Sequence, residues 1–176
     1  MRFSKLIITG KSASGKNYVF SELSKILDKP LIKQTTRPIR SGEVEGVDYR
    51  FISETLFKER IDSNQYITFE SFDIDSDTTW YYGISKEDFN ESNLCILTPG
   101  EIKTLNESDL LIDSCVIFLD IERKVLEQRL NERNDNNDSI TRRLDSDDKD
   151  FIDFNGYSMR YTNPNFKIND LIESIS

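Results

Sequence analysis

A lysine and two glycines near the start of the chain have the spacing of a phosphate-binding loop. Gly10 and Gly15 are five residues apart, and Lys16 directly follows the second glycine. Glycines let such a loop turn tightly and approach a phosphate, while the free N–H groups at the start of the next helix attract anions. Lys16 would reach the outer phosphates. We therefore expect a nucleoside triphosphate to bind the run Gly10, Lys11, Ser12, Ala13, Ser14, Gly15, Lys16 and Asn17.

Asn17 departs from this motif, which normally has Ser or Thr after the lysine to ligate magnesium through a hydroxyl. An amide oxygen can also ligate a hard cation, so Asn17 is a weak candidate for a metal ligand. The alternative is that the whole run is a glycine-rich turn that caps an ordinary helix. The strand-like run before it and the helical pattern after it favour the phosphate loop.

A second group of side chains that could bind phosphate follows in the run 35–53. Arg37 and Arg40 lie close together in a segment broken by a proline and two glycines, and Tyr49 comes shortly after them. Two guanidinium groups and a phenol hydroxyl can hold a phosphate dianion in a fixed geometry. A solvated surface loop is the alternative, and the nearby phosphate loop favours the binding site.

Four arginines flank the polar stretch 134–139. Such a group can neutralise a phosphoryl group during its transfer, and a mobile loop between them can close over the reactants and exclude water. The alternative is i,i+4 ion pairing on exposed helix surfaces. The four residues are Arg129, Arg133, Arg142 and Arg143.

The elements that must position these groups alternate between buried strands and amphipathic helices. Apolar runs at 5–9, 31–32, 94–98, 114–120 and 159–162 predict strands, and helical spacing predicts helices after residue 16, after residue 53, from residue 99, over 121–133 and over 166–175. Residues 65–72 and 79–84 read as the two strands of a hairpin. This order indicates an α/β fold with a central parallel sheet.

The composition of the chain excludes several classes of function. The chain has 176 residues, a formal net charge of −9 and no histidine. The charge argues against nucleic-acid and anionic-membrane partners, and the lack of histidine excludes His-based catalysis. Cys95 and Cys115 lie in apolar runs and are expected to be reduced core thiols of a cytoplasmic protein. We expect neither a signal peptide nor a membrane span.

The run Thr-Thr-Arg-Pro-x-Arg-x-Gly-Glu-Val-x-Gly-x-Asp-Tyr-x-Phe, residues 35–51, resembles the monophosphate-binding segment of guanylate kinases. The phosphate loop, the hairpin end at 80–83 and the arginines of 129–143 follow the same order as in that family. The resemblance implies a P-loop nucleoside triphosphate hydrolase-type core (1–34, 92–132 and 146–176), a small β-rich lobe for the monophosphate (35–91) and a helical lid (133–145).

The resemblance also implies roles for particular residues, with ATP and Mg²⁺ as cofactors and small-molecule nucleotides as partners. Lys16, Arg133 and Arg143 would be catalytic, and Asn163 would contact the adenine of ATP. Arg129 and Arg142 would instead pair with the acidic run 145–150. The acceptor's phosphate would be held by Arg37, Arg40, Tyr49 and Tyr82.

The positions that read the base in this family differ here. Lys33, Thr68, Ile84 and Gly100 replace its polar or acidic residues. The strand alternation puts Glu70 on the same face as Thr68, so Glu70 is the expected contact to guanine. GMP or dGMP is therefore the expected acceptor. A deoxy or modified nucleotide with another base, or a binding module without catalysis, remains an alternative.

Overall fold

The computed structural model describes residues 3–132 and 140–175. The chain forms two compact units. The core unit comprises Met1–Asp28 and Asn93–Ser176, and the inserted unit comprises Lys29–Ser92. Arg133 and the predicted lid tip 134–139 lie outside the described residues.

The core unit contains a parallel sheet with the strand order β6-β1-β7-β8. These strands are β1 (Lys5–Gly10), β6 (Leu94–Ile96), β7 (Ser114–Leu119) and β8 (Met159–Tyr161). Their apolar side chains point to both faces, as expected for a parallel sheet covered on both sides. The α/β fold with a central parallel sheet that the sequence predicts is therefore confirmed.

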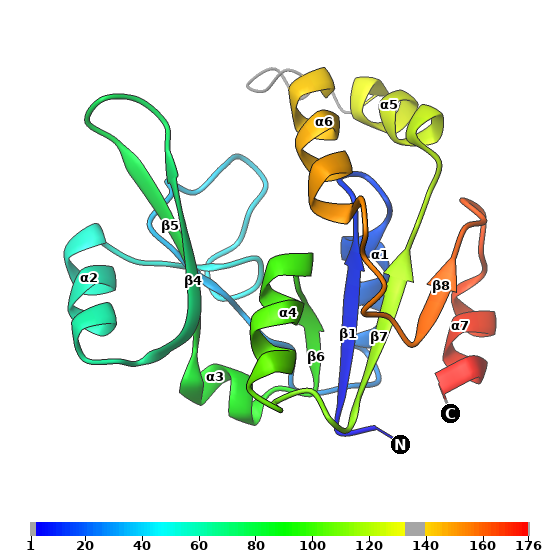
Figure 1. Cartoon of the computed structure of the whole chain (residues 1–176), viewed down its shortest axis with the longest axis horizontal. Coiled ribbons are helices and arrows are strands. Elements are labelled where there is room, and N and C mark those ends of the chain that lie inside the picture. Colours follow the sequence, from blue (N-terminus) through cyan, green and yellow to red (C-terminus); the bar gives the residue numbers. More distant parts are fainter. Residues whose placement is uncertain (1–2, 133–139, 176) are drawn as a thin grey trace. The chain divides into compact units, whose positions relative to one another are not determined.

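Helices cover both faces of this sheet (Figure 1). On one face, α1 (Lys16–Leu23) and α7 (Ile168–Ile175) bury Val19, Leu23 and Leu171 against β1 and β7. On the other, Phe151 of α6 (Ile140–Phe151) stacks on Phe118 of β7, with ring centroids 5.2 Å apart. The remaining helices of the described core unit are α4 (Pro99–Glu107) and α5 (Arg123–Glu132).

The inserted unit contains a second, mixed sheet with the order β3-β2-β5-β4. Its strands are β2 (Gln34–Thr35), β3 (Arg50–Phe51), β4 (Tyr66–Asp73) and β5 (Thr79–Ser85), and its helices are α2 (Glu54–Asp62) and α3 (Lys86–Glu91). The ring of Phe57 stacks on Tyr66 at 4.4 Å. A Cβ at Gly83 would lie 2.7 Å from Tyr66, so β5 needs a glycine where the two rings cross it.

One predicted strand is wrong. Residues 31–32 form no strand, and the pairing falls instead on Gln34 and Thr35. Leu31 is nevertheless buried. Its apolar character therefore reflects burial rather than backbone pairing, and a run of two residues cannot separate these cases.

The two cysteines are free and buried, as the sequence predicts. Cys95 on β6 and Cys115 on β7 both flank β1, which lies between them. Two strand spacings amount to roughly 9–10 Å, which exceeds the Cα–Cα distance of about 7 Å that a disulfide tolerates. Among the described residues, no helix is long and apolar enough to cross a membrane.

Candidate active site

The loop between β1 and α1 has the backbone conformation that its glycines permit. Gly10 and Gly15 adopt φ values of 152° and 104°, and Ala13 between them adopts φ 60°. A Cβ on Gly10 would lie 2.7 Å from the carbonyl oxygen of Leu119, so a larger residue does not fit there. The loop therefore passes close against the end of β7.

The start of α1 has no side-chain cap. Its N-cap is Gly15, which has no side chain to accept a hydrogen bond from the first N–H groups of the helix. The ammonium group of Lys16 turns back over the loop and donates to the carbonyl oxygens of Gly10 at 2.7 Å and Lys11 at 2.8 Å. The backbone N–H groups of a helix start and a lysine thus converge where a phosphate group could bind.

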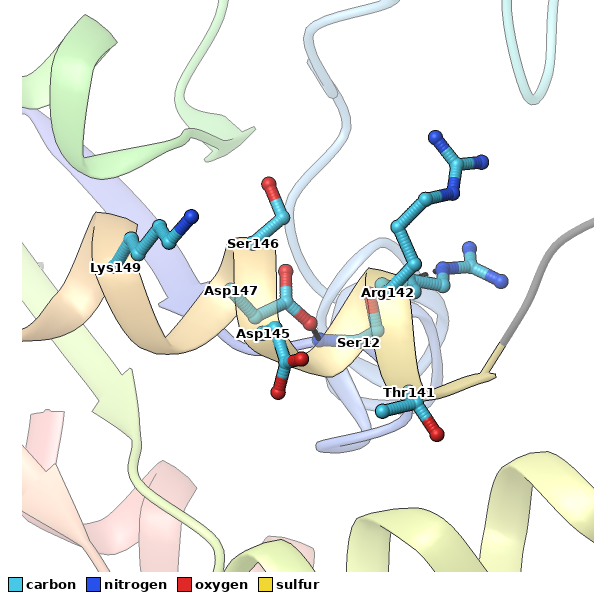
Figure 2. A pocket seen from close by; sticks show the side chains of 8 residues that line it. Ser12, Thr141, Arg142, Asp145, Ser146, Asp147 and Lys149 are labelled. Carbon is cyan, nitrogen blue, oxygen red and sulfur yellow. Dashed lines mark hydrogen bonds between the residues drawn. The ribbon is translucent and has the colours of Figure 1, made fainter.

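Helix α6 supplies two carboxylates to this loop, that of Asp147, which Figure 2 shows beside Ser12, and that of Asp148. Asp147 Oδ2 accepts a hydrogen bond from the backbone N–H of Ser12 at 2.7 Å. Asp148 Oδ1 accepts one from the ammonium group of Lys11 at 2.5 Å, which holds the pKa of Asp148 below its usual range. Sequence reasoning missed both contacts, because it treated the acidic run as a partner for arginines.

The arginine predicted to be catalytic on α6 also contacts the loop. Arg143 donates from Nε to the hydroxyl oxygen of Ser12 at 3.2 Å. A cavity of about 780 Å³ opens here, and Figure 2 shows the side chains around it. Its lining includes Ser12, Arg142, Arg143 and Lys149, so cations and the loop border the same space.

Arg129 does not pair with the acidic run, so that prediction is wrong. Its guanidinium group donates to two backbone carbonyls, of Ala13 at 3.1 Å and of Pro164 at 2.8 Å. Arg123 is the residue that pairs with the acidic run, through Asp145 at 2.8 Å and through Asp148. A sequence does not show which backbone carbonyls will accept hydrogen bonds from an arginine, and for this reason the partner of Arg129 was predicted wrongly.

Asn163 lies in a turn after β8. Its side-chain oxygen accepts a hydrogen bond from the N–H of Asn165 at 2.9 Å, as in an Asx turn. Arg129 connects Pro164 of this turn to Ala13 of the phosphate loop. The structure thus places Asn163 in the same unit as the loop, in a segment tied to it through one side chain.

The carboxylates of Asp147 and Asp148 already accept hydrogen bonds from Ser12 and Lys11, so the candidate metal ligands are other side chains near the loop. Asn17 is exposed on the first turn of α1 and offers one amide oxygen. Glu101 forms a capping box with Thr98 at the start of α4, so its carboxylate serves the helix. No three His, Cys, Asp or Glu side chains within residues 3–132 and 140–175 are grouped to hold a metal. This donor set fits a magnesium ion carried mainly by nucleotide phosphates and water.

In the inserted unit, Arg37 is buried and held by Glu43. The two side chains form a bidentate ion pair with N–O distances of 3.0 and 2.7 Å, and this pairing lowers the pKa of Glu43. The guanidinium carbon of Arg37 also lies 5.5 Å from the ring centroid of Tyr49. Arg40 bonds Glu43 through its backbone N–H at 2.8 Å and is itself exposed.

The predicted tyrosines lie beside this arginine. The rings of Tyr49 and Tyr82 meet edge to face at 5.9 Å. Glu70 on β4 pairs directly with Tyr82 on β5, and Thr68 pairs with Ile84, so these four side chains share one face of the sheet. Ile84 is fully buried and has no polar side-chain atom, whereas Glu70 is partly exposed.

A polar network that sequence reasoning missed fixes the strand before Arg37. The side-chain oxygen of buried Gln34 accepts hydrogen bonds from Arg60 at 2.6 Å and Tyr66 at 2.7 Å, and burial raises the pKa of Tyr66 to about 12. The backbone N–H of Arg37 in turn donates to the hydroxyl of Thr35 at 3.2 Å. These bonds join residues up to 32 positions apart, so no local motif reveals them.

Comparison with known proteins identifies relatives of this chain. The profile of the guanylate kinase family matches residues 3–169. A guanylate kinase from Hydrogenovibrio crunogenus is 32% identical over 177 residues, which cover 94% of this chain and 82% of that protein. A guanylate kinase from Clostridioides difficile is 39% identical over 66 residues, which cover 36% of this chain and 32% of that protein.

A solved structure has a similar fold. The crystal structure of guanylate kinase from Anaplasma phagocytophilum superimposes with a TM-score of 0.66 at 18% identity, covering 99% of this chain and 84% of that one. At this identity the likeness concerns the fold alone.

Proposed function

This chain belongs to the guanylate kinase family, and we propose that it transfers the γ-phosphoryl group of ATP to GMP or dGMP by direct in-line transfer. The observation that carries the proposal is the contact of Arg143 with Ser12, which adds a lid arginine to a phosphate loop that already holds Lys16. A second cation beside the loop favours phosphoryl transfer, because it can neutralise the charge that develops on the transferring group.

The donor's phosphates would lie at the start of α1, against its backbone N–H groups and the positive end of its dipole. Lys16 would leave the carbonyls of Gly10 and Lys11 and bind the outer phosphates. Arg143 and Arg133 would neutralise the charge of the phosphoryl group in transit, Arg133 lying outside the described residues. This reaction needs no nucleophilic side chain, because positioning and charge neutralisation provide most of the catalysis.

The acceptor's phosphate would be held in the inserted unit. Arg37 offers a guanidinium group already fixed by Glu43, and the hydroxyls of Tyr49 and Tyr82 would complete the site, with Arg40 closing on it from the exposed loop. The proposed acceptor lobe of residues 35–91 lies within the compact unit Lys29–Ser92. Residues 140–145 of the proposed lid form the start of α6.

We further propose that Glu70 reads the guanine base. A carboxylate can accept from both the N1–H and the N2–H of guanine, and a buried donor left unpaired costs about 1–3 kcal/mol. Glu70 is the acidic residue that shares a sheet face with Tyr82. Magnesium would arrive with ATP, and Asn17 is the side chain placed to contact it or its water shell.

The decisive experiment incubates the protein with ATP, Mg²⁺ and each ribo- and deoxynucleoside monophosphate in turn, and follows ADP release. GMP or dGMP should give the highest kcat/KM, and Glu70→Gln should reduce it for these acceptors. If no acceptor supports ADP release while GMP still binds, the protein is a binding module and the proposal is wrong. If another base is preferred, the guanine assignment is wrong while the kinase activity stands.

A further inference from the structure

We propose that Asp147 is an internal competitor of the donor's phosphates: its carboxylate occupies an anion position of the loop and must leave when a polyphosphate binds. The inference rests on the proposed function, since it concerns how the same loop admits its donor. Its direct basis is the 2.7 Å hydrogen bond from the Ser12 N–H to Asp147 Oδ2.

A carboxylate oxygen and a phosphate oxygen are equivalent partners for a backbone N–H. Both are anionic acceptors, and a single N–H donates one strong hydrogen bond. While Asp147 holds the Ser12 N–H, a phosphate group cannot use that donor. The negative charge of Asp147 also opposes the approach of ATP to this end of the loop.

Neighbouring contacts hold the carboxylate in place. Asp148, the next residue, pairs with Lys11 of the same loop and with Arg123 of α5. Lys11 is thereby neutralised as well, so α6 presents two negative charges to the loop. The pKa of Asp150, one turn further along, is raised by burial and by the charge of Asp147, in keeping with a partly dehydrated site.

The same helix also carries Arg143, which would stabilise a phosphate that displaces the Asp147 carboxylate. Arg143 precedes Asp147 by four residues and therefore lies on the same face of α6. It donates to the hydroxyl of Ser12, whereas Asp147 accepts from the amide of that residue. A phosphate that replaces the carboxylate would therefore arrive beside a guanidinium group. On α6, Asp147 therefore competes with the phosphate for the loop, while Arg143 stabilises the phosphate once it is bound. The competition weakens the binding of the donor and eases the release of the product nucleotide.

The test measures the equilibrium binding of ATP, tripolyphosphate and adenosine to the full chain by titration calorimetry. Asp147→Ala removes both the charge and the acceptor, and Asp147→Asn removes the charge alone. Asp153→Ala is the matched control, because it causes the same change in net charge at an exposed residue beyond the end of α6.

We expect Asp147→Ala to lower the Kd of ATP and of tripolyphosphate about tenfold or more, the scale of a hydrogen bond to a charged group. Asp147→Asn should give a smaller decrease, Asp153→Ala a change below about twofold, and the Kd of adenosine should not change. An unchanged or increased Kd of tripolyphosphate in both Asp147 variants would overturn the proposal, as would a lack of tripolyphosphate binding in every variant.

A second measurement remains informative if Asp147→Ala does not fold. The amide proton resonance of Ser12 should lie downfield in the free wild-type protein and move upfield in Asp147→Asn, and a resonance equal in both proteins contradicts the contact. Failure of this inference is distinguishable from failure of the kinase activity. A Kd altered as expected without turnover refutes the activity alone, whereas turnover with an unaltered Kd refutes the inference alone.

Discussion

Glu43 and Arg37 form a bidentate ion pair in which each carboxylate oxygen accepts one hydrogen bond from the guanidinium group, at 2.7 and 3.0 Å. The Arg37 side chain is 3% exposed and that of Glu43 is 20% exposed. A nearly buried guanidinium group depends on its partner, because a buried charge without one is costly. Glu43 therefore stabilises the inserted unit and orients the arginine that we assign to the acceptor's phosphate.

Glu43→Gln should lower the free energy of unfolding by about 2 kcal/mol, since it leaves the buried guanidinium group without a counter-charge. Urea denaturation at neutral pH measures this loss. Glu54→Gln is the control, because Glu54 pairs with Lys58 on an exposed helix surface and its removal should cost no more than about 0.5 kcal/mol. Equal effects of the two substitutions would show that Arg37 does not need Glu43.

The same ion pair predicts a dependence of stability on pH. The hydrogen bond from Arg37 lowers the pKa of Glu43 from its usual value of 4.5 in the folded protein. This contribution is therefore complete above about pH 4.5 and is lost as the pH falls through the lower folded value. Wild-type stability should decrease over this window more steeply than that of Glu43→Gln. Parallel pH profiles would contradict the pairing.

Arg129 should affect the binding of ATP by positioning the phosphate loop rather than by contacting ATP itself. Its bonds to Ala13 and Pro164 tie the phosphate loop to the turn that carries Asn163. Arg129→Lys keeps the charge but cannot span two carbonyls with a planar group. We expect the KM for ATP to rise several-fold and the KM for the acceptor to stay constant. Gln128→Ala, on the exposed surface of α5, is the control, and a rise in both KM values would indicate general unfolding instead.

Ser14→Ala should leave the free energy of unfolding unchanged or raise it, whereas Glu43→Gln should lower it. The hydroxyl of Ser14 is buried, and it has no hydrogen-bond partner within the described part of the chain. Removing a polar atom without a partner is neutral or favourable, so Ser14→Ala should change the free energy of unfolding by between zero and about +1 kcal/mol. Ser92→Ala should instead destabilise by about 1 kcal/mol, since the buried hydroxyl of Ser92 donates to the Phe89 carbonyl at 2.8 Å. Thermal or urea denaturation of both variants decides the matter, and a destabilised Ser14→Ala would reveal a partner for that hydroxyl.

The two thiols should react only when the core opens. Cys95 and Cys115 are both fully buried, and burial raises the pKa of Cys115. A reagent therefore has no access to either thiol in the folded state. A disulfide reagent should therefore modify neither thiol in the native protein and both in urea. Rapid modification of the native protein would contradict the position of β6 and β7 in the sheet.

The features that the sequence predicts correctly are those encoded over short distances. Continuous apolar runs indicate β1, β6 and β7, because strands buried on both faces need apolar residues at every position. Gln34 and Thr35 of β2 are polar, and their backbone partners are 16 and 47–49 residues away, so no local pattern marks this strand. Sequence reasoning therefore shifted it to the apolar pair 31–32.

In the candidate active site, too, the local features are predictable from the sequence and the contacts between distant residues are not. The phosphate loop is contiguous, and its motif contains its own geometry, including the positive φ of Gly10 and Gly15. The contact of Asp147 with Ser12 joins residues 135 positions apart and arises only when α6 packs beside the loop. Glu43 could have been predicted, since it lies six residues from Arg37 in the same loop.

The most direct test of the central claim follows the phosphoryl group itself. The protein is incubated with Mg²⁺, GMP or dGMP, and ATP that carries a radioactive γ-phosphate, and the nucleotides are then separated. We predict that the label appears in GDP or dGDP, that Lys16→Ala and Arg143→Ala each slow its transfer by roughly a hundredfold or more, and that Asp153→Ala transfers it at the wild-type rate. Label found in free phosphate alone, or transfer that survives Lys16→Ala unchanged, would contradict the assignment of this protein as a kinase that uses its phosphate loop.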